Sequence, residues 1–197
     1  MSKTNGAFKK DLHRYYEVIS TSGPASLKTK LKLFLGDYGL HCVAIYRFGQ
    51  FSRRLKKRSV VIGLPFRFMH VILNSLMKFF HHVDIDDASI GPGFKIHHVG
   101  TIYIGPIEIG ENFSITHNVT IGIGLSRVYG GFPTLGNNVW VGTGSVIFGN
   151  ISIGNNVIIT SGCILSRNVP DNCLVGGNPG RILMSYQRGE SPFATKG

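Results

Sequence analysis

The chain has 197 residues, of which 43% are hydrophobic and 16% are charged, enough for one packed domain with a smaller element beside it. Its 26 glycines follow no collagen-like triplet, and its three cysteines (Cys42, Cys163 and Cys173) lie at unrelated spacings, which excludes a disulfide framework and a cysteine zinc site. Lys and Arg outnumber Asp and Glu by 21 to 10, and the excess lies mainly before residue 82. The N-terminal half therefore either meets an anionic partner or is simply kept soluble by its charge.

Residues 1–82 are predicted to form a basic, amphipathic α-helical region. Apolar and basic residues alternate at helical spacings up to about residue 58, and the segment SGPAS at 22–26 predicts a break between two helices. The first residues lack the apolar core of a signal peptide, and the cysteines suit a reducing compartment, so we expect a cytoplasmic protein.

Residues 60–80 (VVIGLPFRFMHVILNSLMKFF) are long and apolar enough to suggest a membrane span. Arg67, His70 and Lys78 argue against a span, because charged groups are costly in a bilayer core. Pro65 suits the first turn of a helix, so we predict that the helix starts there.

In that helix Arg67, His70, Asn74 and Lys78 form one narrow polar stripe on an otherwise apolar rod. Two interpretations stay open: the rod packs against sister subunits, or residues 53–80 touch the inner face of a membrane peripherally. The second would use the basic cluster formed by Arg53, Arg54, Lys56, Lys57 and Arg58.

The C-terminal half carries an aliphatic residue at every sixth position. The members are Ile90, Ile96, Ile102, Ile109, Ile115, Ile121, Leu135, Val141, Ile147, Ile153, Ile159 and Leu165. Neither a helix nor a simple alternating strand has this period, whereas a solenoid of short strands joined by Gly and Asn corners does. We therefore predict an all-β solenoid over residues 83–184, in which the residue four after each aliphatic also points inward, and a polar tail at 185–197. Between Ile121 and Leu135 fourteen residues stand where we expect twelve, which predicts a loop that leaves the coil.

Side chains about eighteen residues apart should stack on successive coils. His98 and His117 each follow an aliphatic by two positions and should share an outer column, which we expect Asn137 and Asn155 to continue. A second predicted column consists of Ile123, Thr143 and Ser161, and its small members leave room for a slender ligand.

Histidine takes a proton from a hydroxyl near neutral pH, and a carboxylate on its other nitrogen fixes the tautomer. Asp84, Asp86 and Asp87 are the candidates for that carboxylate. A zinc site of His97, His98 and His117 is not expected, because adjacent residues on a strand point to opposite sides.

Four segments carry a resemblance to a known family: VDIDDASIGPGFKIHHVGTIYIG, ITHNVTIG, FPTLGNNVWVGTGSVIFGNISIGNNV and VPDNCLVGGNPGRIL. They resemble the hexapeptide-repeat acyltransferases, and most of all the serine acetyltransferase branch, over about residues 83–183. The resemblance implies a left-handed parallel β-helix with an N-terminal helical region, a homotrimer, acetyl-CoA as co-substrate and active sites between subunits. Whether two trimers pair into a hexamer through the helical half stays open.

The resemblance also implies roles for individual residues. The catalytic histidine of the family falls on His98, and its supporting aspartate falls on Asp84, with one residue fewer between them than in the family. The positions along the pantetheine arm fall on Thr143 and Ser161, and the basic residue of the closing motif falls on Arg181. We add His117 to the catalytic candidates and Gly124 and Arg167 to the cofactor-binding ones, with a backbone N–H of Gly122 or Gly124 for the oxyanion.

The chain departs from serine acetyltransferases where those enzymes hold the amino acid. Those enzymes have an acidic residue just before the catalytic histidine, and this chain has His97 at that position. They also have an Arg-His pair in the extended loop, where this chain has Gly131 and Phe132. With Tyr129, Phe132 offers an aromatic wall of the kind that sugar rings lie against, so His97, Tyr129 and Phe132 are the candidate substrate-binding residues.

The expected function is therefore acetyl transfer to a sugar hydroxyl of a bacterial capsule, O-antigen or exopolysaccharide, or of its precursor. The hydroxyl attacks the thioester directly. Serine O-acetylation for cysteine synthesis and a non-catalytic solenoid scaffold are the alternatives, and neither a metal nor a nucleic-acid partner is expected.

Overall fold

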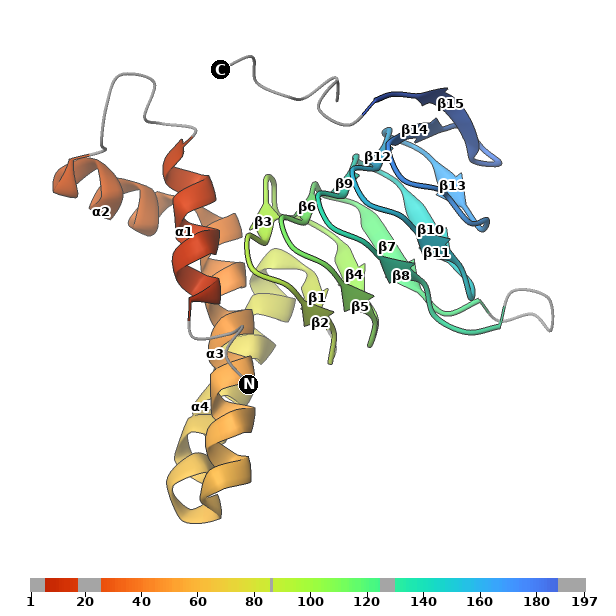
Figure 1. Cartoon of the computed structure of the whole chain (residues 1–197). Helices are drawn as coiled ribbons and strands as arrows, with labels where there is room; N and C mark the ends of the chain where they lie inside the picture. The colour runs from red at the N-terminus through yellow and green to blue at the C-terminus, as the bar shows by residue number, and fades with distance from the viewer. Residues whose placement is uncertain (1–5, 18–25, 86, 125–129, 188–197) are drawn as a thin grey trace.

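The computed structural model describes residues 6–17, 26–85, 87–124 and 130–187 (Figure 1). Within these ranges four helices come first: α1 (Ala7–Glu17), α2 (Leu27–Gly36), α3 (Tyr38–Arg58) and α4 (Val60–His81). Short strands follow from Val83 to Ser185 and wind into a coil. The helices stand at one end of this coil, and α3 and α4 form an antiparallel hairpin that projects away from it.

The strands build three sheets that form the sides of a prism. Sheet A contains β1 (Val83–Ile85), β4 (Ile102–Ile104), β7 (Val119–Gly122), β10 (Val146–Phe148) and β13 (Ile164–Leu165). Sheet B contains β2 (Ser89–Ile90), β5 (Glu108–Ile109), β8 (Thr134–Leu135) and β11 (Ser152–Ile153). Sheet C contains β3 (Lys95–Ile96), β6 (Ser114–Ile115), β9 (Trp140–Val141), β12 (Ile158–Ile159), β14 (Cys173–Gly176) and β15 (Arg181–Ser185). All pairs are parallel except β14 with β15, which closes the coil as an antiparallel end.

The predicted solenoid and its inward positions are confirmed. Every aliphatic of the six-residue series is buried. From Leu135 onward the residues four positions later are buried too, namely Val139, Ser145, Ile151, Val157, Cys163 and Val169, whereas after Ile102 the corresponding Pro106 is exposed. Within the coil the rings of Phe94 and Phe113 stack with centroids 5.6 Å apart. The corners between sheets B and C use asparagines such as Asn138 and Asn156 at positive φ, a conformation that asparagine tolerates better than most residues.

The α4 helix starts five residues earlier than Pro65 suggests, so that expectation is wrong. The Ser59 hydroxyl accepts a hydrogen bond from the Ile62 N–H and caps the first turn, which leaves Pro65 inside the helix. The predicted polar stripe does form, but it turns inward: Arg67 Nη1 lies 2.9 Å from His70 Nδ1, and His70 is buried against α3.

A buried ion pair ties the helices to the first coil. The fully buried Asp11 carboxylate accepts hydrogen bonds from the N–H groups of Gly93 and Phe94 and pairs with Arg47 at 2.7 Å. Arg47 in turn donates to the carbonyl of Ile90. Because α1, α3 and the coil meet at these groups, the start of α3 is held against β3.

Gly39 sets how closely α3 approaches the coil. A Cβ atom on Gly39 would lie 2.3 Å from the Ile96 carbonyl oxygen, so only glycine allows this contact. The approach brings α2 and the beginning of α3 beside residues 97–99, where the histidines lie.

Candidate active site

The register of sheet C places the two predicted histidines on one edge of the prism. Ile96 pairs with Ile115, and the ladder continues through Val141, Ile159 and Val175. Two residues further along each strand the chain turns from sheet C toward sheet A. The residues at these turns are His98, His117, Thr143, Ser161 and Gly177, and we call this corner the histidine edge. The rings of His98 and His117 meet edge to face with centroids 5.9 Å apart.

His98 and His117 of the first predicted column and Thr143 and Ser161 of the second therefore form one column. The other residues that we expected in these columns lie elsewhere, so those expectations are wrong. Asn137 and Asn155 follow sheet B strands and lie on the corner between sheets B and C, where Asn137 Oδ1 accepts a hydrogen bond from the Glu111 N–H. Ile123 follows β7 and lies at the corner between sheets A and B. The error comes from the loop after Ile121. The step of fourteen residues from Ile121 to Leu135 leads to the next sheet, a step that normally takes six residues, whereas we expected it to take twelve. The coil from Ile115 to Val141 therefore spans 26 residues.

A pocket of about 850 Å³ opens where α2 and the start of α3 meet the first turn of the histidine edge. Its lining residues are Lys28, Thr29, Lys32, Leu33, Gly36, Asp37, Tyr38, Gly39, His97, His98 and Val99. Lys28 and Lys32 lie one helical turn apart on α2. The pocket thus joins the exposed His98 to two cationic side chains that the sequence analysis did not single out.

His97 is held as a neutral imidazole. Its ring packs against Trp140 with centroids 4.4 Å apart, and its Nε2 atom is buried without a hydrogen-bond partner among the described residues. Burial, and then the charges of Lys95 and Arg14, lower the pKa of His97 to about 4. At neutral pH this side chain carries no charge with which to hold an ionic group of a substrate.

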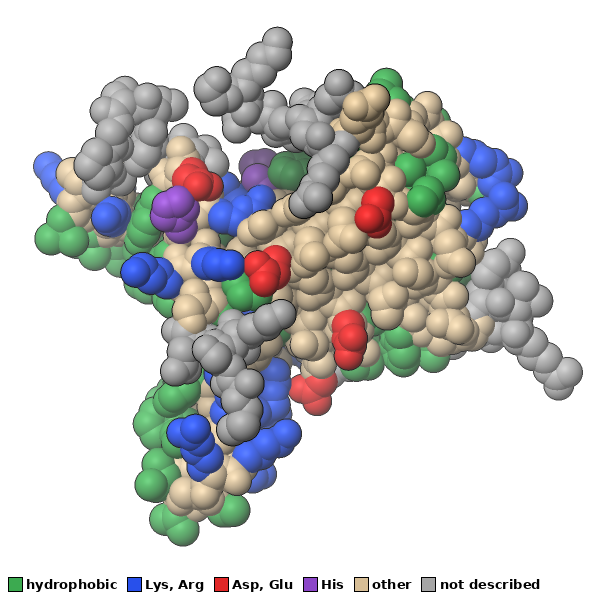
Figure 2. All heavy atoms as spheres, viewed as in Figure 1, with side chains coloured by type: hydrophobic (Ala, Val, Ile, Leu, Met, Phe, Trp, Pro, Cys, Tyr) green, Lys and Arg blue, Asp and Glu red, His purple; other side chains and the backbone are tan. Residues whose placement is uncertain are grey.

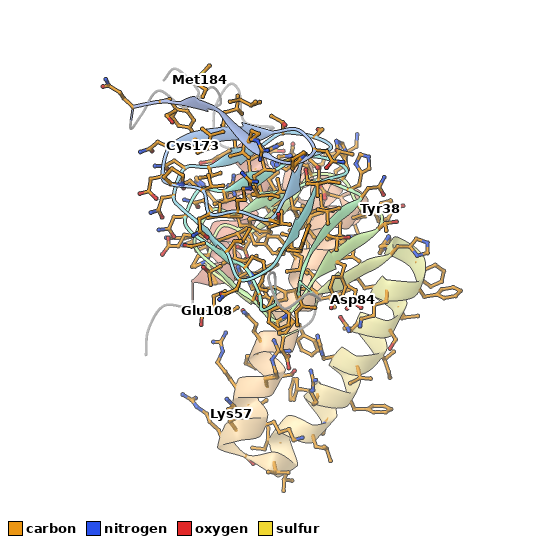
Figure 3. The ribbon with its side chains drawn as sticks, turned by 90° about the vertical axis from the view of Figure 1, so that its right-hand side faces the viewer. Tyr38, Lys57, Asp84, Glu108, Cys173 and Met184 are labelled. Atoms are coloured by element: carbon orange, nitrogen blue, oxygen red, sulfur yellow. The ribbon has the colours of Figure 1, made fainter. Side chains whose placement is uncertain are left out.

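The candidate supporting aspartates turn toward the helical hairpin. Asp84 on β1 forms an ion pair with Lys78 of α4, with Nζ and Oδ1 2.7 Å apart, and Figure 3 shows Asp84 beside that helix. Asp87 pairs with Arg53 at 3.1 Å, and Asp86 lies outside the described residues. The acidic side chain that the structure brings into the pocket of His98 is Asp37, whose Oδ1 accepts the capping hydrogen bond from the Leu40 N–H.

Beyond the histidines, the edge forms an open track of small residues. The Thr143 hydroxyl donates to the Thr116 hydroxyl at 3.1 Å, and a Cβ atom on Gly162 would meet nothing within 4 Å. From His98 to Gly177 the track covers four strand spacings, about 19 Å. It ends near the exposed Arg181 at the start of β15. A slender, extended arm with a phosphate at its far end fits these residues.

The remaining predicted residues lie on a different corner. Gly124 and Arg167 follow strands of sheet A, at the corner between sheets A and B. The Gly124 N–H donates to the Gly131 carbonyl at 3.2 Å, so it is already engaged. Phe132 is exposed beside Gly105 on the same corner, and Tyr129 lies outside the described residues. One chain therefore does not bring Gly124, Phe132 or Arg167 to His98.

Sequence reasoning missed four residues that surround the predicted ones: Lys28, Lys32, Thr116 and Trp140. Thr116 and Trp140 follow from the register once the coil between Ile115 and Val141 is counted as 26 residues. The lysines had no such signal, because the packing of α2 beside the coil is a tertiary contact. Among the described residues no group of three or more His, Cys, Asp or Glu side chains is arranged to hold a metal ion.

No protein-family model matches the chain. A serine acetyltransferase of Synechocystis sp. is 37% identical over 171 residues, which is 85% of this chain and 64% of the relative. A protein of Escherichia coli named as the colanic acid biosynthesis acetyltransferase WcaB is 34% identical over 143 residues, which is 71% of this chain and 87% of that protein.

Among solved structures, soybean serine acetyltransferase complexed with serine superposes with a TM-score of 0.69. It is 26% identical in sequence, and the match covers 93% of this chain and 70% of the soybean chain. The predicted left-handed parallel β-helix with an N-terminal helical region is thereby confirmed. The chain belongs to the hexapeptide-repeat acetyltransferases, the family that contains the serine acetyltransferases and WcaB.

Proposed function

We propose that the protein is an acetyl-CoA-dependent O-acetyltransferase that acts on a sugar hydroxyl of a bacterial surface polysaccharide or of its precursor. One observation carries the choice of acceptor. The residue before His98, which is acidic in the serine enzymes that the chain resembles, is a neutral imidazole packed on Trp140. An acceptor with an ammonium group finds no counter-charge there, whereas a sugar does not need one.

In this proposal His98 is the general base. The exposed imidazole removes the proton from the acceptor hydroxyl, and the hydroxyl oxygen forms a bond to the thioester carbon of acetyl-CoA. The C–S bond then breaks, and the CoA sulfur leaves with the proton from His98. The buried thiols of Cys42 and Cys163 support direct transfer, because burial raises their pKa, for Cys42 to about 12, and disfavours the nucleophilic thiolate.

Acetyl-CoA would lie along the histidine edge, with its pantetheine arm past Thr143 and Ser161 and its phosphates toward Arg181. The small side chains and open glycine corners of that edge support this placement. A guanidinium suits a phosphate group because it donates two parallel hydrogen bonds.

A homotrimer would complete the site. The candidate residues divide between the histidine edge and the corner between sheets A and B, and a threefold assembly of prisms brings unlike corners of neighbouring copies together. Gly124, Phe132 and Arg167 of one copy would then face His98 of the next. We place this trimer in the cytoplasm, either free or at the inner face of the membrane. In the second case residues 53–80 would make the membrane contact.

Serine O-acetylation is the second candidate, and the names of the relatives favour it. Asp37 is the feature of the pocket that would help an ammonium group, since its carboxylate lines the cavity beside His98. The two acceptors differ in charge and can be separated directly.

The test measures release of free CoA from acetyl-CoA, with serine in one reaction and capsular, O-antigen and nucleotide-linked sugars in others. We expect release that depends on a saccharide and falls by about two to four orders of magnitude in His98→Ala, the range for a lost general base. CoA affinity should stay unchanged, and His13→Gln, an exposed histidine on α1, is the matched control. Serine-dependent release would show that the second candidate is right, and unchanged turnover in His98→Ala would remove the mechanism.

A further inference from the structure

The α3–α4 hairpin leaves a long apolar surface in contact with solvent. Val61, Phe68 and Phe79 are 84%, 68% and 73% exposed, and Leu64, Ile72 and Leu76 complete the set at spacings of three and four residues. These six side chains form one stripe along the full outer face of α4. Figure 2 shows the hydrophobic side chains gathered along one side of the projecting hairpin. In the most apolar part of α4 only 17% of the residues are buried, so the helix is not a core helix of this chain.

All Lys, Arg, Asp and Glu positions of the same hairpin are basic. Residues 38–81 contain eight Lys or Arg and no Asp or Glu. Arg47, Arg53 and Lys78 are paired with acids of α1 and the coil. The exposed Lys56, Lys57 and Arg58 form a cluster at the far end of α3, where Figure 3 shows Lys57 well away from the coil.

We propose that this hairpin docks the protein on an anionic lipid surface, with the outer face of α4 lying in the interface between headgroups and acyl chains. An apolar stripe flanked by Lys and Arg is what such an interface binds, because the apolar side leaves water while the cations meet anionic headgroups. The inference rests on the membrane contact named in the proposed function and deepens it, because it specifies the lipid charge and the helix face that binds. The hairpin would make this contact independently of the acyl acceptor, so a vesicle test can fail while the acetyl transfer stands.

Charge favours a lipid surface over a second copy of the chain. Two hairpins packed along their outer faces would combine two exposed clusters of Lys56, Lys57 and Arg58 in one assembly, with no acidic residue on either hairpin to balance them. An anionic surface supplies the balancing charge. A lipid-spanning arrangement is also disfavoured. The α4 helix carries Arg67 within its length, and a span would place that guanidinium deep in the hydrocarbon.

The experiment uses the full chain and sedimentation with vesicles of phosphatidylcholine alone, or of phosphatidylcholine and phosphatidylglycerol in equal parts. We expect binding to the anionic vesicles that weakens as salt rises, and little binding to the neutral ones. Phe68→Ser with Phe79→Ser should weaken binding about tenfold or more, and so should the triple replacement of Lys56, Lys57 and Arg58 by Ala. The matched control replaces Leu183 and Met184 by Ser. These residues are also exposed but lie on β15 in the coil, so this variant should bind normally.

Three outcomes would overturn the proposal. Equal binding to neutral and anionic vesicles, or none to either, would remove the role of the basic cluster. A protein that ignores vesicles but loses mass in light scattering when Phe68 and Phe79 are replaced would show that the stripe joins copies of the chain. Bound protein that resists alkaline carbonate extraction would show a spanning helix instead.

Discussion

Two neighbouring histidines have opposite environments in this protein. His97 is packed on Trp140 with a buried Nε2, while His98, one residue later, is exposed in the pocket and in contact with His117. The difference arises at the turn from sheet C toward sheet A, where His97 packs on the ring of Trp140 from β9 and His98 is left exposed. The neutral side chain and the exposed one are thus distinguished by what each contacts at this turn, and the sequence of the two histidines carries no signal for the difference.

Also at the scale of residues, Lys28 and Lys32 of α2 line the pocket, and from their charge we predict that the acceptor carries an anionic group. Lys28→Ala and Lys32→Ala should raise KM about tenfold for a phosphate-linked sugar, because each removes a charge-assisted contact, and should leave KM for the free sugar unchanged. Steady-state kinetics with the two acceptors measures this difference. Lys30→Ala is the matched control, since Lys30 lies on the same helix but faces Tyr16 instead of the pocket. If Lys30→Ala has the same effect, the pocket does not bind the anionic group.

At the scale of elements, glycines decide how the hairpin closes. A Cβ atom on Gly63 would lie 2.2 Å from the Cα atom of Lys56, and one on Gly49 would lie 2.2 Å from His70 Nε2. The two helices therefore touch backbone to backbone at the tip and backbone to ring in the middle. This close approach turns His70 inward and leaves the apolar residues of α4 on the outside.

Gly63→Ala should consequently lower the free energy of unfolding by about 1–3 kcal/mol, because the helices must separate to admit the methyl group. Urea unfolding followed by circular dichroism measures the change. Gly36→Ala makes a matched comparison at the end of α2, where an added Cβ meets nothing within 4 Å, and its stability should be the same or slightly higher. Equal losses in both variants would contradict the close approach at Gly63.

At the scale of the whole molecule, the buried His70 and the half-buried His97 make stability depend on pH. Burial first, and then the neighbouring Arg67 and Arg53, lower the pKa of His70 to about 4, and His97 has a pKa lowered to about 4 for the same principal reason. The unfolded chain binds protons at these groups near pH 6.5, whereas the folded chain resists protonation until about pH 4. Folding is therefore favoured most above pH 6.5 and loses stability as the pH falls through this window.

We expect the free energy of unfolding to decrease between pH 7.5 and pH 5, with His70 alone accounting for about 2 kcal/mol. Urea titrations at the two pH values provide the measurement. His70→Gln, which cannot take up a proton, should show a smaller decrease, whereas His13→Gln on the exposed surface of α1 should behave like the natural chain. A His70→Gln variant with an undiminished decrease would place the effect elsewhere.

The amino-acid sequence by itself determined the solenoid and its inward residues, because a strict period of six is satisfied by few backbones and every member of the series had to be apolar. It also placed His98 and His117 together, since they lie in adjacent coils with one inserted residue between them. Counting failed at the loop after Ile121, where the number of extra residues depends on which sheet the chain rejoins. That choice is made by hydrogen bonding to the coil below and cannot be read from the length of the loop.

Only the tertiary structure decided what surrounds the histidines. Lys28, Lys32 and Asp37 reach the pocket because Gly39 lets α3 rest on β3 and because the Asp11–Arg47 pair fixes the helices to the first coil. Likewise, the sequence of α4 indicated an apolar helix with one polar stripe. Only the contact between α3 and α4 decided that the polar stripe faces α3 and the apolar side faces outward. Local periodicity is written into consecutive residues, whereas the packing of distant segments depends on the shapes and charges that meet after the chain has folded.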